Sequence, residues 1–154
     1  MRRLLVPALS AACLWACAPA EETPAGIAVE NAWVRAPAVT GRPAAGYLTI
    51  TAGKAGDTLL AASSPAAERI EIHESMAADG MMTMTPLQSV PVAANESVSF
   101  APGGKHLMLF GLDPKVAPGG TMAIDLKFAK AGKVSVTAAV KGPADAPPGD
   151  DHQH

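Results

Sequence analysis

The chain alternates between short runs rich in β-branched or aromatic residues and clusters of glycine and proline. Residues 122–128 and 134–140 alternate apolar and polar side chains, which is the period of a strand with one buried face. Turn signals such as Pro102-Gly103-Gly104 and Pro118-Gly119-Gly120 separate the runs, and no long stretch shows a helical period. This pattern predicts an all-β fold, an antiparallel sandwich or barrel.

The strands expected from these runs lie within one domain, residues 27–140 of the 154-residue chain. They cover residues 27–29, 32–35, 47–51, 58–62, 69–73, 97–100, 105–110, 122–128 and 134–140. Residues 18–26 form a polar linker, and residues 141–154, which contain three prolines and three aspartates, form a tail that we expect to be disordered.

The first 17 residues have the composition of a secretory signal peptide. Arg2 and Arg3 give a basic start, and residues 4–16 are apolar but too few to span a membrane. The end of the segment, Leu14-Trp15-Ala16-Cys17, resembles the lipobox of bacterial lipoproteins, in which the cysteine is lipidated and becomes the first residue. The alternative is ordinary cleavage after Ala18 or Ala20, because both sites present small residues.

Cysteine usage and charge exclude several classes of protein. Both cysteines, Cys13 and Cys17, lie in the signal segment, so the domain has no disulfide, no cysteine-ligated zinc site and no blue-copper centre. Removal of residues 1–17 changes the net charge from −2 to about −4. The chain is therefore not basic enough for a nucleic-acid-binding protein.

Four potential metal ligands follow one another at fixed spacings. Ten residues separate His73 from Met84, 21 separate Met84 from His106, and one separates His106 from Met108. If residues 105–110 form a strand, His106 and Met108 project from the same face. Imidazole and thioether groups without a thiolate make a soft donor set, which suits copper in its reduced state.

This spacing resembles the signature of the periplasmic copper chaperones that serve the dinuclear copper-A centre of cytochrome c oxidase. That signature allows an optional methionine after the first histidine, and here Glu74 takes its place. The segments Asn31-Ala32-Trp33-Val34-Arg35-Ala36-Pro37 and Ala45-Gly46-Tyr47-Leu48-Thr49-Ile50 are also similar, so the resemblance covers about residues 27–140.

The resemblance implies a cupredoxin-like β-sandwich with His73, Met84, His106 and Met108 as ligands of Cu(I). It also implies a periplasmic protein that delivers copper to cytochrome c oxidase subunit II or to another copper chaperone. The lipobox-like segment adds attachment to a membrane through lipidated Cys17 as the alternative to a free protein. We expect a monomer. The alternative function is periplasmic copper storage or resistance without a dedicated recipient, and a third interpretation is a structural sandwich domain with incidental histidines and methionines.

Other residues leave alternatives open. Met76, Met81 and Met82 lie close to Met84 and are candidates for a substitute ligand, whereas Met122 is expected in the core. Glu71 and Glu74 are either solvated strand residues or carboxylates that offset the copper charge or orient His73. We find no nucleophile–base pair or phosphate-binding loop in the sequence, so we expect that the protein is not an enzyme.

The tail ends in Asp150-Asp151-His152-Gln153-His154. A His-x-His sequence beside carboxylates favours borderline ions, so His152 and His154 form a candidate second site for Cu(II). The alternative is a soluble end without a metal.

Overall fold

The computed structural model describes residues 26–145, and its ten elements are all β-strands. Their bounds are β1 (Ile27–Arg35), β2 (Ala44–Ala52), β3 (Asp57–Ser63), β4 (Ala67–Ala78), β5 (Met81–Pro86), β6 (Val90–Val92), β7 (Ser97–Phe100), β8 (Lys105–Leu112), β9 (Thr121–Phe128) and β10 (Gly132–Lys141). The described part contains no helix that is long and apolar enough to cross a membrane. The predicted signal peptide, all but the last residue of the predicted linker and most of the predicted tail, including both of its histidines, lie outside the described residues.

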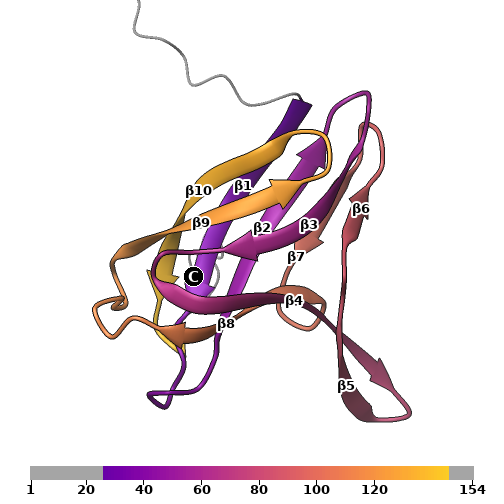
Figure 1. Cartoon of the computed structure of the whole chain (residues 1–154). Coiled ribbons are helices and arrows are strands. Elements are labelled where there is room, and N and C mark those ends of the chain that lie inside the picture. The colour runs from indigo at the N-terminus through magenta and orange to yellow at the C-terminus, as the bar shows by residue number, and fades with distance from the viewer. Residues whose placement is uncertain (1–25, 146–154) are drawn as a thin grey trace, which may run out of the picture.

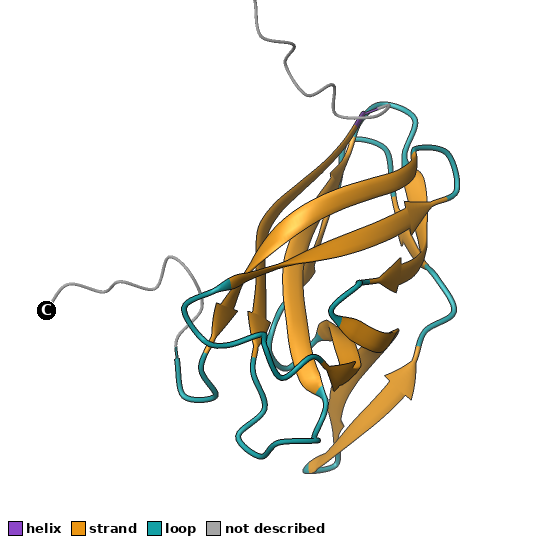
Figure 2. Ribbon diagram, turned by 60° about the vertical axis from the view of Figure 1, so that its left-hand side comes forward, coloured by secondary structure: helices purple, strands orange, loops and turns teal. Residues whose placement is uncertain are grey.

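The strands form one hydrogen-bonded path in the order β5-β4-β8-β2-β1-β10-β9-β3-β6, and β7 pairs with β2 beside β8. The pairings are antiparallel except for β1 with β10, which run parallel. The path folds back on itself, so that β9 and β3 lie over β1 and β2 (Figure 1), and β3 contacts β4 without pairing with it. A second view shows the curved strands surrounding a common interior (Figure 2). The predicted all-β, largely antiparallel sandwich is thus confirmed, with one parallel pair added.

The core lies between these layers and follows the predicted alternation. In β9, Met122, Ile124, Leu126 and Phe128 are buried, and the residues between them are exposed or half-buried. Met122 is therefore a core residue, as expected. Burial of one such side chain contributes about 1.5–3 kcal/mol, so this row of four anchors β9 firmly against the opposite layer.

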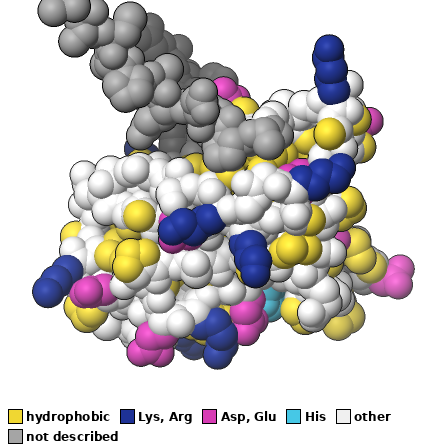
Figure 3. All heavy atoms as spheres, turned by 45° about the horizontal axis from the view of Figure 1, so that its top comes forward, with side chains coloured by type: hydrophobic (Ala, Val, Ile, Leu, Met, Phe, Trp, Pro, Cys, Tyr) yellow, Lys and Arg dark blue, Asp and Glu magenta, His cyan; other side chains and the backbone are white. Residues whose placement is uncertain are grey.

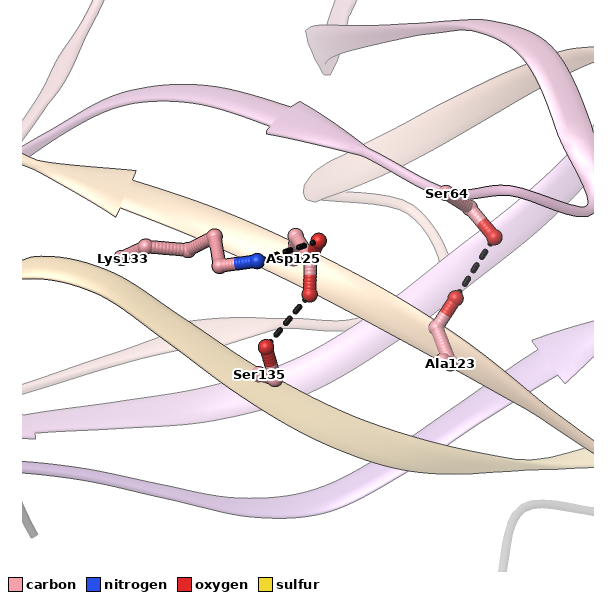
Figure 4. Close-up of polar contacts among 5 residues, drawn as sticks. All are labelled: Ser64, Ala123, Asp125, Lys133 and Ser135. Carbon is pink, nitrogen blue, oxygen red and sulfur yellow. Dashed lines mark hydrogen bonds and ion pairs between the residues drawn. The ribbon is translucent and has the colours of Figure 1, made fainter.

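Polar contacts connect β9 to its two neighbouring strands on the face away from the core (Figure 4). Asp125 in β9 accepts hydrogen bonds from Ser135 and Lys133 of β10, and Asp125 is the direct register partner of Ser135. The Ser64 hydroxyl, just after β3, donates to the carbonyl oxygen of Ala123 at 2.6 Å. These contacts join β3, β9 and β10 at the surface. The two histidines of the described part lie at the other end of the strand order, in β4 and β8.

The hairpin of β4 and β5 differs from the sequence prediction. The predicted strand ends at His73 and none is predicted around Met84, but β4 continues to Ala78 and residues 81–86 form β5. All six residues of β5 are exposed, so its sequence has no buried face to produce an alternating pattern. The two-residue turn, Asp79-Gly80, has positive φ at both positions (51° and 73°), which is the type I′ geometry that Asp-Gly favours.

Candidate metal centre

Two of the four predicted ligands lie directly opposite each other on neighbouring strands. His73 of β4 pairs with His106 of β8, and their ring centroids are 5.9 Å apart at an interplanar angle of 38°. The next same-face pair along these strands is Glu71 with Met108. Cross-strand partners share a face, and so do residues two apart on one strand. One face of the β4–β8 pair therefore carries the side chains of both pairs, His73 with His106 and Glu71 with Met108.

Met84 reaches the same face from the other neighbour of β4. His73 pairs with Pro86 of β5, and Ser75 pairs with Met84, so Met84 is a diagonal neighbour of His73. Met108 is the corresponding diagonal neighbour on β8. Diagonal neighbours in an antiparallel sheet are about 7–8 Å apart, which long side chains span. His73 thus lies at the centre of the set, with the other three predicted ligands as its cross-strand neighbours.

The four side chains differ in exposure. His106 is 6% exposed and the His73 side chain 13%, and Met108 is half-buried. Met84 is 57% exposed on the β4–β5 hairpin. In the space-filling view a small histidine surface is visible beside acidic and hydrophobic side chains (Figure 3). The arrangement is a largely buried histidine pair beside one exposed predicted ligand, the flexible unbranched thioether of Met84.

Hydrogen bonds define which ring nitrogen of each histidine carries the proton. Nδ1 of His106 donates to the carbonyl oxygen of Gly104 at 3.1 Å, which leaves its Nε2 with a free lone pair. Nε2 of His73 donates to Oε2 of Glu71 at 2.9 Å. Nδ1 of His73 is buried and has no hydrogen-bond partner. A buried polar atom without a partner lowers the stability of the fold by about 1–3 kcal/mol. An unpaired nitrogen of this kind calls for a partner, and this nitrogen is therefore a candidate metal donor.

Glu71 also has a second partner. Its Oε1 accepts from Nε of Arg69 at 2.8 Å, and the Arg69 guanidinium lies 4.2 Å from the ring centroid of Phe110. The hydrogen bond from His73, together with the charge and hydrogen bond of Arg69, outweighs desolvation and lowers the pKa of the Glu71 carboxyl. The sequence allows Glu71 to be either a solvated strand residue or a carboxylate that acts on His73. The structure shows the contact with His73.

Glu74 lies on the opposite face of β4, where it accepts a hydrogen bond from Nζ of Lys105 at 2.7 Å. It is therefore a half-buried residue with a cationic partner rather than a neighbour of the His73 ring.

The remaining methionines of the hairpin divide between its two faces. Met82 pairs with Ala77 and shares the face of Met84 and His73. Met76 and Met81 pair with Thr83 and Ala78 on the other face. All three are more than half exposed. Of the three candidates for a substitute ligand, only Met82 lies on the face of the histidines.

An aromatic cluster that the sequence analysis did not assign to the site adjoins it. Arg35 pairs with Ala45, and Ala45 pairs with Met108, so the three share the face of the histidines. Trp33 and Tyr47 form the register pair two residues further along the same strands, and their ring centroids are 4.5 Å apart. The Arg35 guanidinium lies 5.1 Å from the centroid of the Trp33 ring. Burial raises the pKa of the Tyr47 hydroxyl although Arg35 opposes this shift. The sequence contains a signal for this cluster: in residues 31–37 and 45–50 these side chains alternate with residues of the opposite strand face.

Comparison with known proteins identifies the family to which this chain belongs. The family model described as "Putative lipoprotein LpqE-like" matches residues 27–140. The chain is 32% identical over 117 residues to "Putative lipoprotein Lxx21020" of Leifsonia xyli subsp. xyli (strain CTCB07), covering 75% of this chain and 70% of that one. The chain belongs to the LpqE-like family.

The chain is also similar to solved structures of PCuAC domains. The copper-bound PCuAC domain from PmoF2 is 25% identical with a TM-score of 0.66, covering 78% of this chain and 96% of that domain. The solution structure of CuI-DR1885 from Deinococcus radiodurans is also 25% identical, with a TM-score of 0.57 and coverage of 79% and 81%. These likenesses confirm the predicted resemblance to the periplasmic copper chaperones and the cupredoxin-like sandwich.

Proposed function

We propose that this protein is a periplasmic copper chaperone that binds Cu(I) through His73, Met84, His106 and Met108. The observation that carries the proposal is the register, which makes the other three ligands cross-strand neighbours of His73 on a single face. The described residues hold no group of three or more His, Cys, Asp or Glu side chains suited to a metal ion. The two thioethers complete the donor set, and thioether sulfur is a ligand that soft Cu(I) accepts.

The relatives support copper as the cargo. One solved PCuAC domain is described as copper-bound, and DR1885 was solved in a form described as CuI. Free lone pairs on Nε2 of His106 and Nδ1 of His73 give the proposed ion two nitrogen donors without any change of tautomer.

The chemistry of the four ligands suits transfer rather than permanent retention. All are uncharged, so the bound ion keeps its positive charge and is held less tightly than it would be by thiolates. Transfer to the cysteine-containing copper-A centre of cytochrome c oxidase, through subunit II or another chaperone, is then energetically downhill. Met84, exposed on the hairpin, is the ligand that a recipient replaces first.

Binding is tested by titrating Cu(I) against a chromophoric chelator with wild type, His106→Ala and Met108→Leu. We expect one tightly bound Cu(I) in wild type and loss of that binding in both variants. Met81→Leu is the matched control, because Met81 is exposed on the opposite face of the same hairpin. Undiminished binding in both ligand variants would contradict the proposed site.

Delivery is tested separately in a deletion strain grown with scarce copper. The proposal predicts loss of copper from cytochrome c oxidase and restoration by the wild-type gene but not by the Met108→Leu variant. Normal oxidase together with sensitivity to excess copper would instead establish storage or resistance.

We further propose that the protein is exported and anchored to a membrane through lipidated Cys17. The family and the Leifsonia relative are both described as lipoproteins, which supports this assignment. Mass spectrometry of the mature amino terminus tests it: a lipidated Cys17 is expected, and an unmodified terminus after Ala18 or Ala20 would exclude the anchor.

The second proposed site, for Cu(II), is formed by His152 and His154 in the tail. Removal of residues 143–154 should lower the Cu(II) stoichiometry and leave Cu(I) binding unchanged. Unchanged Cu(II) stoichiometry would contradict the tail site.

A further inference from the structure

We infer that Glu71 is a positioning residue that fixes the His73 ring so that Nδ1, rather than Nε2, is its copper-binding nitrogen. This inference rests on the proposed function. It assigns different donor atoms to the two histidines, Nδ1 for His73 and Nε2 for His106, and gives a role to the carboxylate two residues before His73.

The direction of the His73 hydrogen bond follows from the chemistry of its partner. An ionised carboxylate only accepts hydrogen bonds, so Nε2 of His73, 2.9 Å from Oε2 of Glu71, must carry the proton. A neutral ring carries one proton. The lone pair therefore resides on Nδ1, the buried nitrogen that has no protein partner.

Glu71 is itself held in place. Arg69 occupies its other oxygen at 2.8 Å, and the guanidinium of Arg69 lies over the ring of Phe110, the direct cross-strand partner of Arg69. The two carboxylate oxygens thus face different partners along one strand face, and tilting the carboxylate out of this orientation would weaken both contacts. Contacts from Phe110 of β8 through Arg69 and Glu71 thus end at the His73 ring.

Such a carboxylate contact has two effects on a metal-binding histidine: it fixes the tautomer and ring orientation, and it raises the basicity of the donor nitrogen. It also places a negative charge beside a site whose four ligands are neutral. His106 is oriented differently, by the carbonyl oxygen of Gly104, which carries no net charge. Loss of Glu71 should therefore affect His73 and leave the tautomer of His106 unchanged.

The test compares wild type, Glu71→Leu and Glu74→Leu by long-range ¹H–¹⁵N correlation of the histidine rings in the metal-free, full-length protein. The spectra are recorded at mildly alkaline pH, where an ordinary imidazole is neutral. Glu74 is the matched control: it lies on the same strand with similar exposure and has a cationic partner, but on the opposite face.

We expect His73 in wild type and Glu74→Leu to be protonated at Nε2, and Glu71→Leu to show a mixture of tautomers at His73 only. In a Cu(I) competition titration, Glu71→Leu should weaken binding by about 10–100-fold, the usual effect of removing such a partner, and Glu74→Leu by less than about 2-fold. Glu71→Gln retains an acceptor oxygen and should fall between wild type and Glu71→Leu.

Protonation of wild-type His73 at Nδ1, or an unchanged tautomer in both Glu71 variants, would overturn the inference. Because these spectra need no metal, they separate this inference from the proposed function. Failure of wild type to bind Cu(I) would refute the copper site, whereas normal Cu(I) binding with no effect of Glu71 substitution would refute the positioning role alone.

Discussion

The substitution Asp57→Asn tests how the loops before β3 and between β9 and β10 are held together. Asp57 is 6% exposed. Its Oδ1 accepts from the backbone N–H groups of Thr58 at 2.7 Å and Lys130 at 2.9 Å, and its Oδ2 accepts from that of Ala131 at 2.8 Å. Although burial opposes ionisation, these three hydrogen bonds and the charge of Lys130 lower the pKa of the carboxyl.

The expected change in the free energy of unfolding follows from the hydrogen bonds that the asparagine amide can keep. The amide oxygen of the variant side chain would still accept from Thr58 and Lys130, but as a neutral acceptor, and the amide NH₂ would face the N–H of Ala131. Hydrogen bonds to charged groups contribute about 1.5–3 kcal/mol, and an unpaired buried donor costs about 1–3 kcal/mol. We therefore expect the free energy of unfolding to fall by about 2–4 kcal/mol, which lowers Tm by about 10 °C for a domain of this size.

The assay is urea and thermal unfolding of wild type, Asp57→Asn and Asp113→Asn. Asp113 is the control, because its Oδ1 accepts one exposed backbone hydrogen bond, from Lys115 at 2.9 Å. The amide oxygen of asparagine can still accept that hydrogen bond, so the Asp113→Asn substitution should cost less than about 1 kcal/mol. A loss below about 0.5 kcal/mol for Asp57→Asn, or equal losses for the two variants, would refute the reasoning.

The same contact has a defined pH dependence. Because the folded-state pKa of Asp57 is lower than the unfolded one, its stabilisation is complete above the ordinary carboxyl pKa of about 3.9 and is lost as the pH falls through the folded-state value. The stability difference between wild type and Asp57→Asn should therefore be constant near neutral pH and narrow below about pH 4. A difference that does not narrow in acid would contradict the assignment.

Three further predictions concern the turn before β3, the hairpin and the core behind the site. Gly56→Ala should cost about 2–4 kcal/mol in unfolding experiments, because φ is +59° and a Cβ would lie 2.9 Å from a backbone oxygen; Gly80→Ala, with φ of +73° and open space, should cost only about 1–2 kcal/mol. Met84→Leu should weaken Cu(I) binding in a chelator competition, whereas Met81→Leu should not. Leu107→Ala should cost about 2–5 kcal/mol by urea unfolding, because Leu107 is fully buried between the two proposed ligands of β8, yet it should leave Cu(I) affinity within about 3-fold.

Local patterning predicted the strands that have one buried and one polar face. Residues 122–128 and 134–140 alternate clearly, and β9 and β10 form there. The period of two also places His106 and Met108 on one face of β8, whatever strands β8 pairs with. Each of these predictions depends only on residues within a single strand.

Long-range register could not be predicted in the same way. No local signal specifies that His73 faces His106, or that β1 pairs with β10 in parallel. β5 was missed because its residues are all exposed and it has no buried face. The Asp79-Gly80 turn was the available signal for this hairpin, since both residues adopt positive φ. β6 has only three residues, too few to show a period.

The contact between Glu71 and His73 was predictable as a shared face but not as a hydrogen bond. Two residues on one strand face share an orientation, yet which partner a carboxylate chooses depends on its other neighbours. Here Arg69, which lies over the ring of the cross-strand residue Phe110, is the second partner of Glu71. Side-chain contacts of this kind appear only once the register is fixed.

The central claim is that two imidazoles and two thioethers bind a single Cu(I). Copper K-edge X-ray absorption of the Cu(I)-loaded protein tests it most directly, because sulfur and nitrogen scatter differently. We predict two sulfur and two nitrogen neighbours in wild type, and one sulfur in either Met84→Leu or Met108→Leu. A copper environment of nitrogen and oxygen alone, or a sulfur count unchanged in both variants, would contradict the claim.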